Sequence, residues 1–264
     1  MSGCRGVGLG LAAGGLLLAA CGGSLPPLRG QMVVGRDAYA LFVAGDGPAG
    51  GDLYAVHTEG GPAVQVTFTN VGEMRPTLSP DGSTVAFLRG RSPRDSTPGS
   101  LWVMSLQSGT DRELELPRGA GRPTEVAWAK DGRTLVVRTA AGLYRLNAPP
   151  AKPEARAVPA GERAAADSSL AVLLGDPVFA RVVPCAEPGA LCVQGDTGAP
   201  GLLARDARDP FRWGDDSVAY FLGDRVEIRP LGPGRARRLD LADPPSRARE
   251  MTVFLGRTDG YVSP

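Results

Sequence analysis

Short apolar segments alternate with tight turns along most of this chain. In three places a short apolar segment, a turn and a second apolar segment follow one another, at residues 75–88, 124–137 and 210–221. The clearest turn is Pro80-Asp81-Gly82, in which proline presets φ, aspartate hydrogen-bonds the local backbone and glycine accepts a positive φ. The pattern predicts a β-hairpin at each of the three places.

Each predicted hairpin is followed by two more predicted strands, the second of which is more polar. These strands are expected at residues 100–104 and 111–116, 143–146 and 155–158, and 225–228 and 236–241. Asp131 lies 50 positions after Asp81, and Asp215 lies 84 positions after Asp131. The longer interval fits two units of about 42 residues, the period of four-stranded propeller blades. We therefore predict a further unit over residues 168–206, with strands near 170–174, 178–183, 191–194 and 202–205.

The two ends of the chain complete the predicted architecture. Residues 38–69 offer three strands, and residues 251–255 form an apolar strand with no partner after it. Pairing this last strand with the first unit removes an exposed edge that would invite aggregation. The sequence thus predicts an all-β fold, a β-propeller of four-stranded antiparallel blades closed by pairing of its N- and C-terminal strands. Five blades are expected, or six if residues 31–34 and 261–262 extend a further sheet; a β-sandwich is the alternative fold, but it has no reason to repeat one turn at blade spacing.

The clearest unit also carries a family resemblance. Pro76-x-x-Ser79-Pro80-Asp81-Gly82, followed by Val85-Ala86-Phe87 and Leu101-Trp102-Val103-Met104, resembles the WD-like repeats of the TolB-type propeller family. The resemblance implies blades of four antiparallel strands around a central channel. TolB has an α/β domain ahead of its propeller and acts in envelope integrity through protein contacts. Only residues 22–37 separate Cys21 from the first predicted strands here, so we expect that domain to be absent.

An apolar run at residues 7–20 follows a short head with one positive charge and ends in Leu18-Ala19-Ala20-Cys21. This segment resembles the bacterial lipobox, which implies that Cys21 becomes the lipidated first residue of the mature protein. Fourteen helical residues span roughly 21 Å, less than the ~30 Å of a bilayer core, which argues against the alternative of a transmembrane helix. A plain signal peptide is the other alternative. We predict a signal peptide at residues 1–20, a lipidated cysteine with a flexible tether at 21–37 and a propeller at 38–264. The expected location is the bacterial cell envelope, with the lipid anchoring the chain to a membrane on its extracytoplasmic side.

Composition narrows the chemistry. The formal net charge of the 264 residues is +1, so no attraction to nucleic acid is implied. A single histidine, His57, excludes a multi-histidine metal site, and we expect neither a metal nor a cofactor. Cys185 and Cys192 form an even pair in an exported chain and predict a disulfide across a hairpin that turns at Glu187-Pro188-Gly189. A redox-active pair is the alternative, although the CxxC spacing is absent.

Catalysis is not expected. The chain has no Gly-x-Ser-x-Gly motif, and His57 is read as a polar residue at a hairpin end. A glycosidase-like hydrolase with channel carboxylates is the alternative, with Glu125 and Asp215 as candidates, but turn formation already explains Asp215. A purely structural envelope lipoprotein is a further alternative.

The predicted role is that of a binding or scaffolding module. Propellers bind at the channel mouth, where inner strands and their loops converge, and Arg75, Glu125 and Arg212 are expected to line that mouth at corresponding points before the inner strands. The partner is expected to be another envelope protein or a small ligand, in addition to the membrane that holds the lipid. The basic cluster at residues 235–238 predicts a solvated edge strand, or alternatively a contact with anionic lipid.

Overall fold

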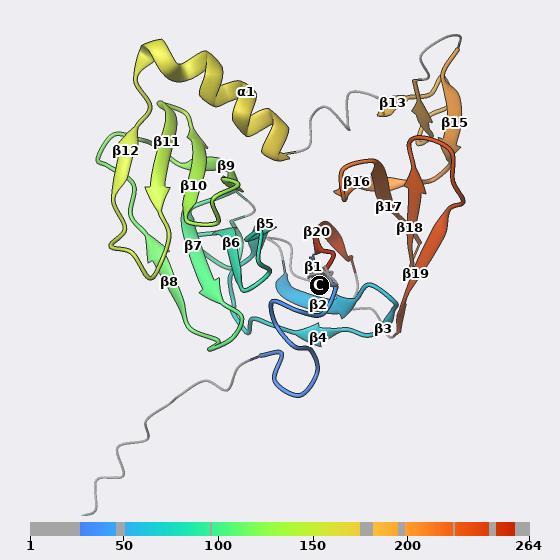
Figure 1. Cartoon of the computed structure of the whole chain (residues 1–264), viewed down its shortest axis with the longest axis horizontal. Coiled ribbons are helices and arrows are strands. Elements are labelled where there is room, and N and C mark those ends of the chain that lie inside the picture. The colour runs from blue at the N-terminus through green and yellow to red at the C-terminus, as the bar shows by residue number, and fades with distance from the viewer. Residues whose placement is uncertain are drawn as a thin grey trace, which may run out of the picture.

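The computed structural model describes residues 27–45, 51–95, 97–174, 182–194, 199–223, 225–242 and 247–256. The predicted signal peptide, Cys21 and residues 261–262 lie outside these ranges. The described residues form short strands, one 3-10 helix and one α-helix (Figure 1). The elements are β1 (Tyr39–Ala44), β2 (Asp52–His57), β3 (Gly61–Pro62), β4 (Val64–Gln65), β5 (Glu73–Leu78), β6 (Thr84–Arg89), β7 (Ser100–Ser105), β8 (Asp111–Leu114), β9 (Pro123–Trp128), β10 (Thr134–Thr139), β11 (Gly142–Asn147), β12 (Ala155–Ala157), η1 (Ala160–Glu162), α1 (Arg163–Leu174), β13 (Val182–Pro184), β14 (Leu191–Val193), β15 (Gly201–Ala204), β16 (Arg208–Trp213), β17 (Ser217–Leu222), β18 (Arg225–Pro230), β19 (Arg237–Ala242) and β20 (Arg249–Phe254).

The strands of the described residues form five sheets, which we name in chain order. The first is β20-β1-β2-β4, the second β5-β6-β7-β8, the third β9-β10-β11-β12, the fourth β13-β14-β15, and the fifth β16-β17-β18-β19 with β3 added at its edge. Neighbouring strands within each sheet are antiparallel, apart from the parallel pair of β19 and β3. The sheets are arranged around a common centre, with β5, β9, β16 and β20 toward the middle (Figure 1). The fold is therefore a β-propeller, as the repeat predicts; the number of blades stays a prediction.

Two strand pairings join the chain ends. β20 pairs with β1, so the last described strand becomes the innermost strand of the first sheet. The sequence predicts this pairing, and that it closes the ring stays a prediction. On the outer side, β3 leaves the first unit and pairs with β19 of the fifth sheet, Leu241 opposite Gly61. The first sheet therefore contains a strand from the far end of the chain, and the fifth sheet contains one from the near end.

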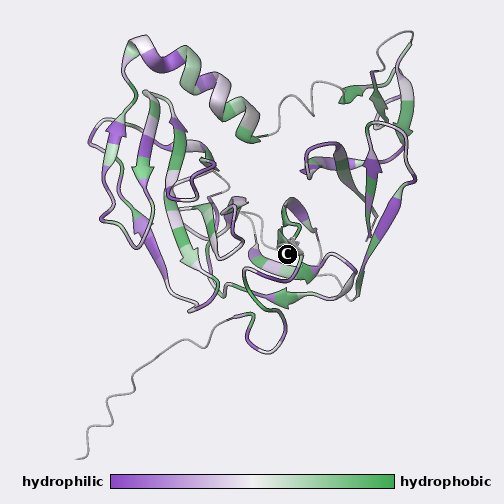
Figure 2. Cartoon of the chain, viewed as in Figure 1, coloured by the Kyte–Doolittle hydropathy of each residue, from purple (hydrophilic) through white to green (hydrophobic). Residues whose placement is uncertain are grey.

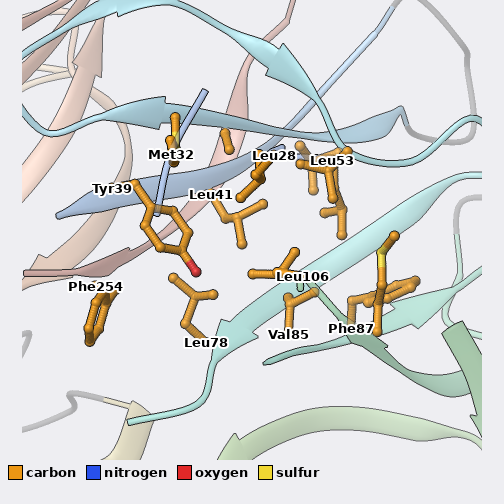
Figure 3. Packing of buried hydrophobic residues seen from close by; sticks show 14 residues of the cluster. Leu28, Met32, Tyr39, Leu41, Leu53, Leu78, Val85, Phe87, Leu106 and Phe254 are labelled. Atoms are coloured by element: carbon orange, nitrogen blue, oxygen red, sulfur yellow. The ribbon is translucent and has the colours of Figure 1, made fainter. Parts of the chain in front are cut away.

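Apolar side chains fill the spaces between neighbouring sheets. Tyr39, Leu41, Leu78 and Val85 point toward one another between the first and second sheets (Figure 3). Similar clusters lie between the second and third sheets, between the first and fifth, and between the fourth and fifth. The outer strands β8 and β19 are largely hydrophilic (Figure 2). This division follows from alternation along each strand, which buries one set of side chains against a neighbouring sheet.

Helix α1 replaces a strand that we predicted near residues 170–174. That prediction is wrong, because the leucines at positions 170, 173 and 174 follow helical spacing. Three consecutive alanines at residues 164–166 also favour a helix. Ala166 and Leu170 pack against Val136 and Leu143 on the third sheet. The helix thus covers a sheet face that would otherwise meet the next blade, and the described part of the fourth sheet has three strands.

The segment ahead of β1 is more ordered than a tether. Residues 31–34, which would have begun a sixth blade, form turns and no strand. Leu28 is fully buried and Met32 nearly so, and both pack in the cluster between the first and second sheets. His57 Nε2 donates to the carbonyl of Gln31 over 3.0 Å, which fixes this segment to the end of β2. The described part of the predicted tether, residues 27–37, therefore belongs to the propeller.

Candidate functional site

The innermost strands share an irregularity near the centre of the ring. The pairing register shifts by one residue in β5, β9, β16 and β20, which marks a β-bulge in each strand. Three bulges hold a non-glycine residue at positive φ: Arg75 at 53°, Asp209 at 47° and Glu250 at 49°. Such backbone is strained in L-residues, and bulges re-aim side chains next to binding sites. The strained bulges therefore make the space that these strands enclose a candidate binding site.

That space is a central cavity of about 680 Å³. Residues of β5, β9, β16 and β20 line it, together with Leu173 and Leu174 at the end of α1. Arg75, Glu125 and Arg212, the residues predicted at the channel mouth, all belong to this lining. The structure thus brings the three predicted side chains to one site of a size that is ordinary for ligand pockets.

The expected correspondence between the three residues holds only in part. Leu78, Trp128 and Arg212 each pair with the second residue of the following strand. Arg212 therefore corresponds to Leu78, whereas the bulge residue that corresponds to Arg75 is Asp209. Arg75 and Glu125 each lie six residues before a turn aspartate, whereas Arg212 lies only three residues before Asp215; the same count of six from Asp215 leads to Asp209.

Both carboxylates in the lining have a cationic neighbour. Glu125 Oε2 accepts from Arg138 Nε over 2.6 Å, and Arg138 Nη1 reaches Asp167 of α1 over 2.7 Å. The hydrogen bonds that Arg138 donates, the one to Glu125 foremost, raise the pKa of its guanidinium above the ordinary value. Asp215, whose side chain is fully exposed, lies 4.0 Å from Arg212 Nη1. The negative charge of the lining is thus largely compensated by the protein itself.

Two cations of the lining are not compensated in this way. The guanidinium of Arg75 and the ammonium of Lys130 form no ion pair with any described residue, and both side chains are exposed. Glu250 lies beside Arg75, but its Oε2 accepts the backbone N–H of Arg75 over 2.6 Å. Lys130 was not among the predicted site residues, because its position in the turn before Gly132 gave no signal of a binding role.

The rest of the lining is largely apolar. Leu255 is half exposed, at 50%, and Leu173 and Leu174 are partly buried. Trp128 forms part of the wall, where its Nε1 donates to the carbonyl of Thr77 over 3.0 Å and joins the second and third sheets. Leu173 and Leu174 are not among the predicted site residues, because the sequence predicts a strand over residues 170–174.

A second cavity, of about 610 Å³, lies between α1 and the third sheet. Its lining includes Val136, Arg145 and Ser169, and it shares Lys130 and Leu173 with the central cavity. Arg145 approaches Glu162 at 3.6 Å. The shared residues place the two cavities side by side, next to the end of α1.

Other sequence predictions can be located in the structure. The predicted disulfide joins Cys185 and Cys192, with 5.2 Å between their Cα atoms. The chain turns at Gly189, with φ 76°. Within the described ranges no group of three or more His, Cys, Asp or Glu side chains is arranged to hold a metal ion. No helix in the same ranges is long and apolar enough to cross a membrane.

This chain is similar to a curated bacterial protein over part of its length. No protein-family model matches this sequence. The uncharacterized peptidase YuxL of Bacillus subtilis (strain 168) is 30% identical over 92 residues, which are 34% of this chain and 13% of that protein. The chain therefore spans a small part of the curated relative it matches.

Solved structures show similarity at low sequence identity. TolB from Acinetobacter baumannii is 15% identical with a TM-score of 0.48, over 82% of this chain and 66% of TolB. The β-propeller domain of the trilobed protease from Pyrococcus furiosus is 11% identical with a TM-score of 0.34, over 79% of this chain and 72% of that domain. TolB, whose repeats the Pro80-Asp81-Gly82 unit resembles, is thus among the structures to which this chain is similar.

Proposed function

We propose that this protein is a lipoprotein of the bacterial cell envelope whose propeller binds a partner in its central cavity. The observation that carries the proposal is the convergence of Arg75, Glu125 and Arg212 on one cavity of about 680 Å³. A purely structural propeller would fill its channel with apolar side chains. An open, partly charged cavity instead supports a binding role.

The attachment rests on the lipobox at Leu18-Ala19-Ala20-Cys21. Acyl chains on Cys21 would anchor the protein without a membrane-spanning helix. Residues 22–26 separate that cysteine from Pro27, the first described residue. Fully extended, this linker reaches about 20 Å, which would keep the propeller close to the membrane surface.

The proposal assigns no catalytic step to the cavity. Glu125 is held by Arg138 at 2.6 Å, and Asp215 is fully exposed beside Arg212. Neither arrangement favours the pair of differently protonated carboxyl groups that glycoside hydrolysis requires. Binding is therefore the function that the site supports best.

The anchor is tested by mass spectrometry of the protein purified from membranes. We expect diacylglyceryl modification of Cys21, and we expect Cys21→Ser to move the protein from the membrane fraction to the soluble fraction. Unmodified Cys21 on a freely soluble product would contradict the anchor while leaving the binding role to be judged separately.

The binding role is tested by crosslinking in intact cells followed by affinity capture. We expect partners recovered with the natural protein to be lost when Arg75, Glu125 and Arg212 are all replaced by alanine. The matched control is Arg235→Ala, because Arg235 is exposed and does not line the cavity. Retention of every partner by the triple variant would overturn the cavity as the binding site.

A further inference from the structure

We infer that the central cavity recognises an acidic peptide segment, with Arg75 and Lys130 as the groups that bind its carboxylates. This inference rests on the proposed function of the cavity as a binding site and names the chemistry of its ligand. Three features of the cavity support it: the charges of the lining, the backbone at Arg75, and the shape and polarity of the adjoining surfaces.

The charges of the lining are unevenly matched. Arg75, Lys130 and Arg212 contribute positive charge, and Glu125 and Asp215 contribute negative charge. Glu125 is paired with Arg138, which lies outside the lining, and Asp215 approaches Arg212. Arg75 and Lys130 are left as cations without an ion-pair partner among the described residues. A recess whose lining carries a net positive charge concentrates ligands of the opposite sign.

The backbone at Arg75 adds an independent observation. Its φ is 53°, and Pro76 follows, which restricts the preceding residue still further. The side chain is exposed, so burial does not compensate this strain. Instead, the bulge and the hydrogen bond from its N–H to Glu250 hold Arg75 at the cavity wall. The bulge, which Asp209 and Glu250 share at similar φ, thus presents the Arg75 side chain to the cavity instead of to a neighbouring sheet.

The polarity and extent of the surfaces favour a peptide over a small anion. Leu173, Leu174 and Leu255 offer apolar contacts beside the two cations. The cavity under α1 adjoins the central one through Lys130 and Leu173. A peptide that carries carboxylates between apolar side chains has room in both cavities. An inorganic anion would make no use of the apolar walls.

The first test is a selection from a random twelve-residue peptide library displayed on phage, against the full chain in detergent micelles. We expect the selected peptides to be enriched in Asp and Glu next to apolar residues. The same selection against a chain carrying Arg75→Gly and Lys130→Gln is expected to lose that enrichment. Arg75→Gly suits this purpose because glycine accepts the positive φ, so the variant is expected to fold.

The second test measures the affinity of one selected peptide by fluorescence anisotropy. Because hydrogen bonds to charged groups contribute more than neutral ones, each of Arg75→Gly and Lys130→Gln is expected to weaken binding about tenfold. A peptide with Asn and Gln in place of Asp and Glu is expected to bind equally weakly to all variants. Arg235→Gln, an exposed arginine outside the lining, serves as the control and is expected to bind like the natural protein.

Each contrary result overturns a defined part of the argument. Selected peptides without an acidic bias would overturn the inference but keep the cavity as a binding site. No selected peptide at all would count against both the inference and the proposed function. Displacement of the peptide by N-acetylglutamate at equal affinity would assign the site to a small organic acid and so overturn the peptide.

Discussion

At the scale of single residues, the most unusual group is Glu73 at the start of β5. Its side chain is completely buried, accepts a hydrogen bond from Thr67 Oγ1, and is paired with Arg89 Nη2 at 2.8 Å. Arg89 Nη2 also binds Asp111 Oδ2 at 2.9 Å, and Arg89 Cζ lies 4.0 Å from the centroid of the Trp102 ring. Burial raises the pKa of Glu73 to about 7, because it outweighs the opposite effects of Thr67 and Arg89.

This carboxyl makes stability depend on pH in a defined direction. Between pH 4.5, the ordinary pKa of this carboxyl, and about pH 7, the folded chain keeps the Glu73 proton while the unfolded chain releases it. The folded state binds more protons in this window, so its stability falls as pH rises, by up to about 3 kcal/mol. We expect the urea midpoint to fall between about pH 5 and about pH 7.5, and to fall less in Glu73→Gln. An identical pH dependence in both proteins would contradict this account.

At the scale of elements, the fourth sheet is the least supported part of the ring. Its three described strands are short, and they pack through Leu203 against Val218 and Tyr220 of the fifth sheet. The Cys185–Cys192 disulfide closes the β13–β14 hairpin, where the N–H of Cys185 also donates to the carbonyl of Ala190 over 3.1 Å. A covalent link across so short a loop stabilises this hairpin and little else.

Removal of the disulfide is therefore expected to act locally. In the chain with Cys185→Ser and Cys192→Ser, we expect faster amide hydrogen exchange in β13, β14 and β15. Because the open loop regains conformational entropy in the unfolded chain, the free energy of unfolding is expected to fall by roughly 2.5 kcal/mol. The amides of β6 and β10 serve as the internal control and are expected to keep their protection. Loss of protection in all sheets, or in none, would contradict a local role.

At the scale of the whole molecule, the turn that ends in Gly82 packs against strands from both ends of the chain. Gly82 and Gly132 end the repeated Asp-Gly turns and share a φ of 65°. A Cβ at Gly82 would come within 2.5 Å of the Phe254 ring on β20, whereas at Gly132 the nearest atom, on Pro80, is 3.7 Å away. The Tyr39 hydroxyl also donates to the carbonyl of Gly82, so this turn packs against both ends of the chain.

The two glycines provide a matched pair of variants. Gly132→Ala is expected to lower the free energy of unfolding by about 1 kcal/mol, because alanine disfavours positive φ. Gly82→Ala is expected to cost about 1 to 3 kcal/mol more, since its Cβ also overpacks Phe254. Chemical denaturation measures both values, and the excess should shrink in the background of Phe254→Ala. Equal costs at the two glycines would mean that Phe254 does not pack there as described.

The sequence by itself determined the repeating strands, the turns and the disulfide. Proline, aspartate and glycine in the Pro80-Asp81-Gly82 turn act through local backbone preferences, and alternation along a strand shows in one dimension. The sequence also indicated Arg75, Glu125 and Arg212 as neighbours of the central strands. Attachment at Cys21 remains a prediction, because it depends on residues that the structure does not describe.

Only the tertiary structure decided where α1 lies, which cations of the cavity have no ion-pair partner among the described residues, and that β3 pairs with β19. The helical spacing of Leu170 and Leu173 became decisive once the third sheet offered an apolar face. Arg138 neutralises Glu125 only because β9 and β10 pair in one register. The meaning of Arg75 and Lys130 likewise depends on side chains far away in sequence, since charge balance in a cavity is a property of its whole lining.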